Sequence, residues 1–205
     1  DLPSIERNTN HIISYTREDI YLIALDQCVK RTPELRKVQD SKTRINLAKK
    51  KYPSFINNNN QKANKVTNMV IKNCAEYNVP ELTPVIVNIL GNETGGFNFS
   101  AKVLNKKGIA GCPKGSMQTD LDTIVKLYKD VKSSDAKFIN KLKSKYATPN
   151  ALYRAIQTDV ELGLKVGILV FKQKLRKNGG NVKQAIRDYC GGSYKYDYKV
   201  KIPEK

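Results

Sequence analysis

One glutamate, Glu93, stands where a carboxyl group could act as a general acid. It follows an apolar run over residues 84 to 90 and precedes Gly95 and Gly96, so a buried helix should end there. A carboxyl group held against apolar side chains keeps its proton to higher pH and can donate it to a leaving group. Most glutamates at helix ends are simply solvated, so the position alone does not establish this role.

Three segments downstream of Glu93 combine glycine with polar and aromatic side chains. They are residues 108 to 111 followed by Met117 and Gln118, residues 179 to 185, and residues 188 to 192. Together with Glu93-Thr94-Gly95-Gly96-Phe97, they resemble the motifs of the lytic transglycosylase and goose-type lysozyme superfamily. The order and spacing match over about residues 73 to 192. The resemblance implies a lysozyme-like helical domain with Glu93 as its catalytic residue.

The resemblance also suggests roles for the residues around Glu93. Gln118 and Tyr189 would orient the glycan or Glu93 through hydrogen bonds. Thr94 and Met117 belong to the same expected substrate-binding set, although packing suits Met117 better than chemistry does. A core position with a satisfied hydroxyl group explains Tyr189 equally well.

The chain departs from the family pattern in two places. Residues 112 to 116 separate the glycines from Met117, and Cys190 stands where the family usually has Asn. Because the resemblance places both segments beside the cleft, we predict a Cys112–Cys190 disulfide, which leaves Cys28 to pair with Cys74. Four cysteines permit three connectivities, and four buried thiols in a reducing compartment are the alternative.

The supply of carboxyl groups near Glu93 bears on the reaction. Most glycosidases use a second carboxylate to activate water or to form a covalent intermediate, yet no Asp or Glu lies between Glu93 and Asp120. Asp120, Asp122 and Asp188 could still approach in space. The resemblance supplies a route with one carboxyl group: a lytic transglycosylase cleaves the MurNAc-β-1,4-GlcNAc bond and forms 1,6-anhydro-MurNAc. A goose-type muramidase, which hydrolyses the bond, is the alternative.

The charge of the chain restricts its partners. The 205 residues include 37 Lys and Arg against 19 Asp and Glu, a net charge of +18, which favours a polyanionic partner. Peptidoglycan glycan strands fit, whereas a specific nucleic-acid partner is not expected because no recognition motif is present. A non-catalytic wall-binding or assembly component of a phage or secretion apparatus, or a basic nucleic-acid-binding protein, remains a further alternative.

Neither a metal ion nor a cofactor is expected. The single histidine, His11, and the widely spaced cysteines lack the spacing of zinc ligands, and His11 is expected to be a surface residue rather than a base for nucleophilic catalysis. No apolar run approaches the roughly 20 residues that span a bilayer. We expect an exported protein, periplasmic, extracellular, wall-bound or virion-associated, with any leader already removed.

Hydrophobic periodicity predicts a mainly α fold that positions these residues. The expected helices cover residues 17–30, 41–52, 61–79, 83–93, 120–131, 134–146, 149–177 and 181–190, of which 149–177 is the longest. Residues 57–60 read as a polar link, 94–119 as loops or a small β-hairpin, and the Tyr-rich residues 194–202 as an extended strand. Gly163 and Gly167 should let a neighbour approach their helix closely.

The chain divides into three expected parts. Residues 1–60 form an N-terminal helical extension, residues 61–192 the lysozyme-like transglycosylase domain, and residues 193–205 an extended tail.

Overall fold

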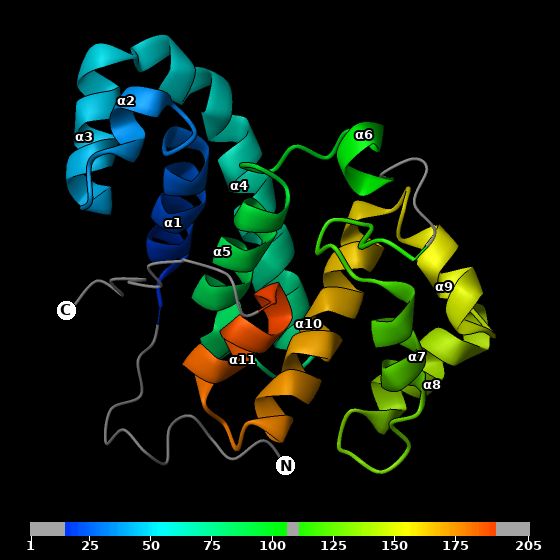
Figure 1. Ribbon diagram of the computed structural model, residues 1–205. Helices are drawn as coiled ribbons and strands as arrows, with labels where there is room; N and C mark the ends of the chain where they lie inside the picture. Colours follow the sequence, from blue (N-terminus) through cyan, green and yellow to red (C-terminus); the bar gives the residue numbers. More distant parts are fainter. Residues whose placement is uncertain (1–14, 106–110, 192–205) are drawn as a thin grey trace.

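The computed structural model describes residues 15–105 and 111–191, and these residues form a mainly helical fold (Figure 1). The elements are α1 (Arg17–Val29), α2 (Pro33–Arg36), α3 (Ser41–Lys51), α4 (Pro53–Glu76), the 3-10 turn η2 (Pro80–Leu82), α5 (Thr83–Glu93), α6 (Ala101–Leu104), α7 (Leu121–Tyr128), α8 (Ala136–Lys145), α9 (Pro149–Ala155), α10 (Val160–Lys177) and α11 (Val182–Cys190). The predicted mainly α class is confirmed.

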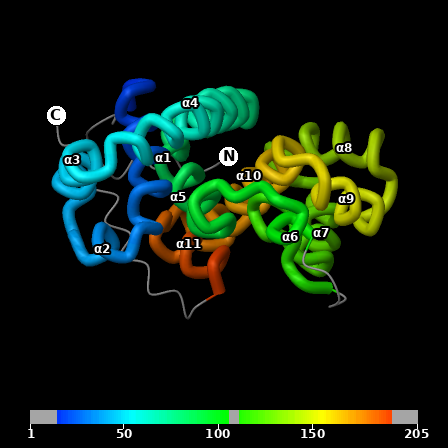
Figure 2. Tube along the Cα trace, turned by 90° about the horizontal axis from the view of Figure 1, so that it is seen from above, coloured from blue at the N-terminus to red at the C-terminus, as the bar shows by residue number. Residues whose placement is uncertain are grey.

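Helix α10 runs through the middle of the molecule (Figure 1). It contacts α4 on one side, α7 on the other, and α11. Helices α1, α4 and α5 pack on one another, and α3 packs beside α1 and α4, as the view from above shows (Figure 2). A single hydrophobic core connects these groups, from Ile20 on α1 to Ile186 on α11.

Local signals explain where the first helices begin. The Thr16 hydroxyl accepts from the backbone N–H of Asp19 at 3.1 Å, and the Asp19 carboxylate accepts from the N–H of Thr16 at 2.9 Å. This reciprocal capping box satisfies two N–H groups that the first turn leaves without partners.

Helix α5 was expected to be central because its sequence is too apolar for a surface helix. Its side chains Ile86, Ile89 and Leu90 are completely buried. Its predicted central place is confirmed.

The predicted polar link at residues 57–60 is wrong, because these residues lie inside α4. Pro53 stands in the first turn of α4, where its missing N–H costs nothing. Tertiary contacts then favour the helical form of the Asn-rich segment: the Tyr21 hydroxyl donates to the side chain of Asn60, and Arg17 donates to Asn64 at 2.8 Å. The α4 helix therefore crosses the expected domain boundary at residue 60.

The predicted single helix over residues 149–177 is also wrong. It is divided into α9 and α10, and α4 is the longest helix described. The break arises because Asp159 adopts an extended backbone and its side chain accepts from the N–H of Leu162 at 3.0 Å. This N-cap starts a new helix. The capping hydrogen bond of Asp159 offsets the helical hydrogen bonds that are missing between α9 and α10.

Residues 94–105 and 111–119 are mostly loop, as predicted, with the short helix α6 among them. Lys114 and Thr119 form one antiparallel bridge with N–H···O distances of 3.1 and 2.8 Å. No strand occurs within the described ranges, so the hairpin is reduced to this one pair. His11, residues 106–110 and the Tyr-rich tail lie outside the described residues. The predictions of a strand at residues 194–202 and of a separate tail at residues 193–205 therefore stay predictions.

Candidate functional site

Glu93 is the last residue of α5, and its side chain is half-buried. The helix ends there because Thr94 replaces the next helical hydrogen bonds. Its hydroxyl donates to the Leu90 carbonyl at 2.6 Å and accepts from the N–H of Phe97 at 3.0 Å. Thr94 is itself buried, at 2% exposure. It therefore shapes the turn that carries Glu93, and its expected contact with substrate is not available in this conformation.

Helix α1 and the turn that follows it hold the same end of α5 from the other side. Arg31 donates to the Gly91 carbonyl at 3.0 Å, and the Gln27 amide donates to the side chain of Asn88 at 2.7 Å. A Cβ atom at Gly91 would lie 2.6 Å from the Gln27 side chain, so only glycine permits this approach. The N-terminal helices thus support the turn that carries Glu93.

The loop that contains Met117 and Gln118 rests on α10. A Cβ atom at Gly167 would lie 2.4 Å from Met117, and one at Gly163 would lie 2.6 Å from the Ser116 hydroxyl oxygen. The predicted close approach at these two glycines is therefore confirmed, and the neighbour is this loop. Met117 is completely buried, which agrees with packing rather than contact with a ligand.

Tyr189, on α11, joins the loop to Glu93. Its hydroxyl donates to the Met117 carbonyl at 2.7 Å. The pKa of Tyr189 is raised well above its ordinary value, chiefly by burial and next by the negative charge of Glu93. The phenol therefore stays protonated, and the Glu93 carboxylate lies close enough to influence it. Tyr189 therefore combines the two expected features: its hydroxyl group has a hydrogen-bond partner, and its ring lies near Glu93.

Gln118 has a strained backbone at φ +50°, a region that non-glycine residues rarely adopt. Its amide nitrogen donates to the carbonyls of Gly115 at 2.8 Å and Val103 at 3.0 Å. Its buried amide oxygen meets no donor among the described residues, and the buried hydroxyl of Thr119 lies near Tyr189 without reaching hydrogen-bond geometry. These two oxygens are the unmet acceptors of the site.

Backbone strain gathers around the same place. Three non-glycine residues of the described ranges have positive φ, and two of them, Phe97 at +65° and Gln118, belong to the segments that meet near Glu93. Such strain costs roughly 1–3 kcal/mol per residue and is typical of functional sites. This strain supports the assignment of the region as the candidate site.

Two of the three other carboxylates that could assist Glu93, Asp120 and Asp188, have structural partners. Asp120 caps α7 by accepting from the N–H of Thr123 at 2.8 Å. Hydrogen bonds from Asn178 and Gln184 lower the pKa of Asp188. Asp122 is exposed on α7. Glu93 is the carboxylate of this region whose charge acts on Tyr189 most strongly.

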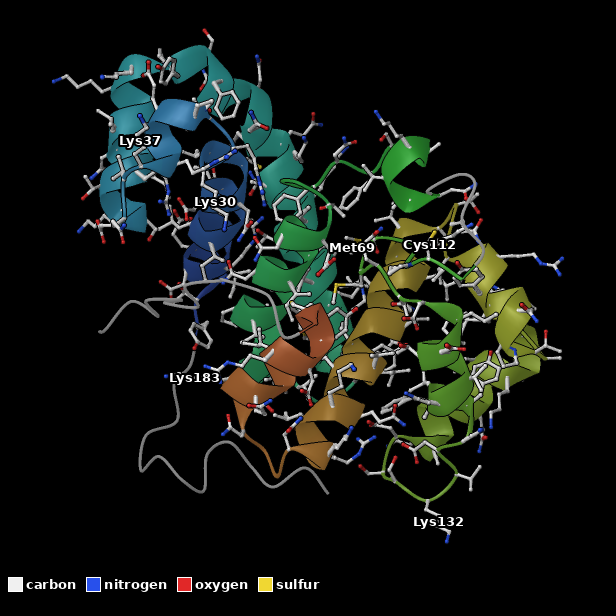
Figure 3. All side chains as sticks on the ribbon, in the orientation of Figure 1. Lys30, Lys37, Met69, Cys112, Lys132 and Lys183 are labelled. Carbon is white, nitrogen blue, oxygen red and sulfur yellow. The ribbon has the colours of Figure 1, made fainter. Side chains whose placement is uncertain are left out.

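The four cysteines, all within the described ranges, form no disulfide bond. Cys28 and Cys74 are buried, and burial raises their pKa values to about 11 and about 12. Cys112 lies in the loop beside α9 (Figure 3), where its carbonyl accepts from the Tyr153 hydroxyl. Cys190 ends α11, which packs on α10. The predicted pairing is therefore absent from the structure.

Two further properties of the described residues concern ligands and membranes. No group of three or more His, Cys, Asp or Glu side chains is placed to hold a metal ion in residues 15–105 and 111–191. Within the same ranges, no helix combines the length and the apolar character that a membrane span requires.

Comparison of the chain with sequence profiles of protein families, with curated proteins and with solved structures gave no match.

Sequence reasoning missed the contribution of α1 to the site. Gln27 lies on α1, and Arg31 lies in the turn that follows it, four residues later; this spacing would place both on one face of a continued helix. Nothing in the sequence says which distant segment that face meets. The partner, Gly91, is visible only in the fold.

Proposed function

We propose that the chain is a peptidoglycan lytic transglycosylase with a lysozyme-like helical domain, in which Glu93 acts first as general acid and then as general base. The observation that carries the proposal is the meeting of three segments distant in sequence. Glu93, the loop with Met117 and Gln118, and Tyr189 were each expected at the site from the sequence. Their proximity is what such a site requires.

The reaction needs only one carboxyl group. Glu93 protonates the bridging oxygen as the bond between C1 of MurNAc and that oxygen breaks, and the bond's electron pair leaves with GlcNAc. The Glu93 carboxylate then removes the proton from the 6-hydroxyl of the same MurNAc, and O6 bonds to C1. Glu93 ends protonated, and no water is consumed. The capping of α7 by Asp120 and the hydrogen-bonded state of Asp188 favour this route over hydrolysis with a second carboxylate.

The neighbouring side chains would act by positioning. Tyr189 remains a hydrogen-bond donor because its pKa is raised, and it fixes the loop through the Met117 carbonyl. The free amide oxygen of Gln118 is an acceptor for a sugar hydroxyl group once the loop adjusts. Such orientation contributes to the rate as strongly as the acid itself.

The charge distribution suits a polyanionic polymer. The labelled side chains of Lys37, Lys132 and Lys183 lie at separate edges of the molecule (Figure 3), so these three charges do not share one groove. This spread favours an extended anionic cell wall over a specific nucleic acid. Exported, wall-bound or virion-associated placement, including a phage or secretion assembly, belongs to the same proposal.

Purified peptidoglycan tests the proposal. We expect the wild-type protein to release soluble fragments and Glu93→Gln to release less than about one hundredth as much, because general acid catalysis contributes roughly 10²–10⁴ in rate. Glu18→Gln, at an exposed position of α1, is the matched control and should retain full activity. If wild type and Glu93→Gln release equally little while both sediment with the wall, the non-catalytic wall-binding alternative replaces the enzyme.

A further inference from the structure

A hollow of about 270 Å³ lies between α4, α8 and α10. Its lining includes Tyr77 at the end of α4, Phe138 and Leu142 on α8, and Leu162 on α10. The rings of Tyr77 and Phe138 meet edge to face, with centroids 4.9 Å apart and planes at 86°. Such a surface favours a flat apolar group. The volume suits a small ligand of one or two rings.

The carboxylates around this hollow are already engaged. Glu76 forms an ion pair with Lys165 at 3.6 Å. Glu161 accepts from Lys72 at 3.2 Å and from Asn73 at 3.1 Å, and these hydrogen bonds lower its pKa. Asp159, the remaining carboxylate of the lining, caps α10. Of these three carboxylates, only Asp159 forms no ion pair with a lysine or arginine of the described residues.

Two lysines of the lining differ from Glu76 and Glu161 because they have no ion-pair partner. Lys141 and Lys145 are exposed, lie one turn apart on α8, and form no ion pair with any carboxylate of the described residues. The Lys145 ammonium group lies 5.6 Å from the centroid of the Tyr146 ring, which also lines the hollow. Two lysines without an ion pair against one such aspartate leave the hollow a net positive charge beside its aromatic side chains.

The hollow is separate from the candidate active site. Both use α10, but Glu161, Leu162 and Lys165 line the hollow, whereas Gly163 and Gly167 contact the Ser116–Met117 loop. At 100° per residue, these two sets lie on different faces of the helix. Occupation of the hollow therefore leaves Glu93 accessible.

We propose that this hollow binds a small aromatic carboxylate, with its ring on Tyr77 and Phe138 and its carboxylate group between Lys141 and Lys145. The inference does not depend on the reaction proposed for Glu93. An apolar surface with a few convergent charged groups is the usual composition of a small-molecule site.

The probe is 2-naphthoate, titrated into the ¹⁵N-labelled full chain and followed by amide chemical shifts. We expect saturable shifts centred on Tyr77, Phe138 and Leu162. The double variant Lys141→Gln/Lys145→Gln should weaken binding about fivefold or more. The control Lys49→Gln/Lys50→Gln removes the same charge from exposed positions on α3 and should bind as wild type does.

A neutral analogue, 2-naphthalenemethanol, separates charge from ring binding and should bind more weakly than 2-naphthoate. Overlay of the variant spectra without ligand checks that each variant is folded. Shifts that scatter over the surface, that cluster at another place, or that persist unchanged in the Lys141→Gln/Lys145→Gln variant would overturn the proposal.

Discussion

The guanidinium group of Arg31 donates a hydrogen bond to the main-chain carbonyl of Gly91, 3.0 Å away, two residues before Glu93. The same guanidinium nitrogen lies 3.3 Å from the Gln27 side-chain oxygen. An element expected to be a separate N-terminal extension is thus in contact with the turn that presents the proposed catalytic group. The position of Glu93 depends on α1.

Removal of this contact should loosen the end of α5. We expect Arg31→Ala to lower the free energy of unfolding by about 1.5–3 kcal/mol, because it removes a hydrogen bond from a charged donor, although the Gly91 carbonyl still accepts from the N–H of Gly96 at 2.8 Å. Amide hydrogens of residues 94–96 should also exchange faster. Urea unfolding and hydrogen exchange measure the two effects. Arg36→Ala, at an exposed position of α2, is the control, and equal behaviour of the two variants would contradict the proposed clamp.

The Gly167→Ala variant tests the close contact with Met117 through the sign of its change in the free energy of unfolding. In an unobstructed helix, replacement of Gly by Ala stabilises by about 1 kcal/mol. Here the added Cβ would lie 2.4 Å from Met117, so we expect Gly167→Ala to destabilise by about 1–3 kcal/mol. Thermal and urea unfolding give the sign. Asn140→Ala on the exposed face of α8 controls for helix propensity, and a stabilised Gly167→Ala variant would exclude the close contact.

A buried ion pair fastens α10 to the loop before α8. The Lys172 ammonium group lies 2.6 Å from the Asp135 carboxylate, with side-chain exposures of 3% and 1%, and it also donates to the Tyr77 carbonyl at 2.6 Å. Lys172→Met leaves the Tyr77 carbonyl without this donor, whereas Asp135 keeps Arg176 as an ion-pair partner, so we expect a cost of about 1–3 kcal/mol. The exposed pair of Lys72 with Glu161 is the comparison.

Lys72→Met should cost less than about 1 kcal/mol, because its ammonium group is solvated. Urea unfolding of both variants provides the measurement. A cost for Lys172→Met as small as that for Lys72→Met would show that the buried pair is not formed.

The sequence predicted those features that short segments determine by themselves. Thr16 with Asp19 starts α1, and the apolar run before Glu93 forms a central helix, because capping and hydrophobic periodicity are local properties. Gly163 and Gly167 predicted a close neighbour for the same reason. The lack of a side chain on a helix face is known from the sequence, whichever segment packs against it. Which loop fills it required the fold.

The errors arose where a tertiary contact or a single cap overrides the local pattern. The Asn-rich residues 57–60 continue α4, and the Tyr21 hydroxyl of α1 donates to the side chain of Asn60 among them. Asp159 divides one apolar stripe into two helices, although the stripe itself continues. The disulfides were inferred from a resemblance, and the structure instead encloses Cys28 and Cys74 as thiols.

Cysteine reactivity follows from those two environments. Because burial raises the pKa values of Cys28 and Cys74 to about 11 and about 12, hardly any thiolate is present at pH 8, and the fraction increases only as the pH rises toward these values. We expect iodoacetamide to leave both residues unmodified in the native protein and to modify both in denaturant. Peptide mass spectrometry without reduction gives the readout. Failure to modify them in denaturant would restore the Cys28–Cys74 disulfide.

The central claim is that Glu93 works without water as a reactant. Digestion of peptidoglycan in ¹⁸O-labelled water, followed by mass spectrometry of the fragments, tests it most directly. We predict 1,6-anhydro-MurNAc ends without ¹⁸O from the wild-type protein and no such ends from Glu93→Gln. Reducing ends that carry ¹⁸O, or equal products from both proteins, would contradict this mechanism.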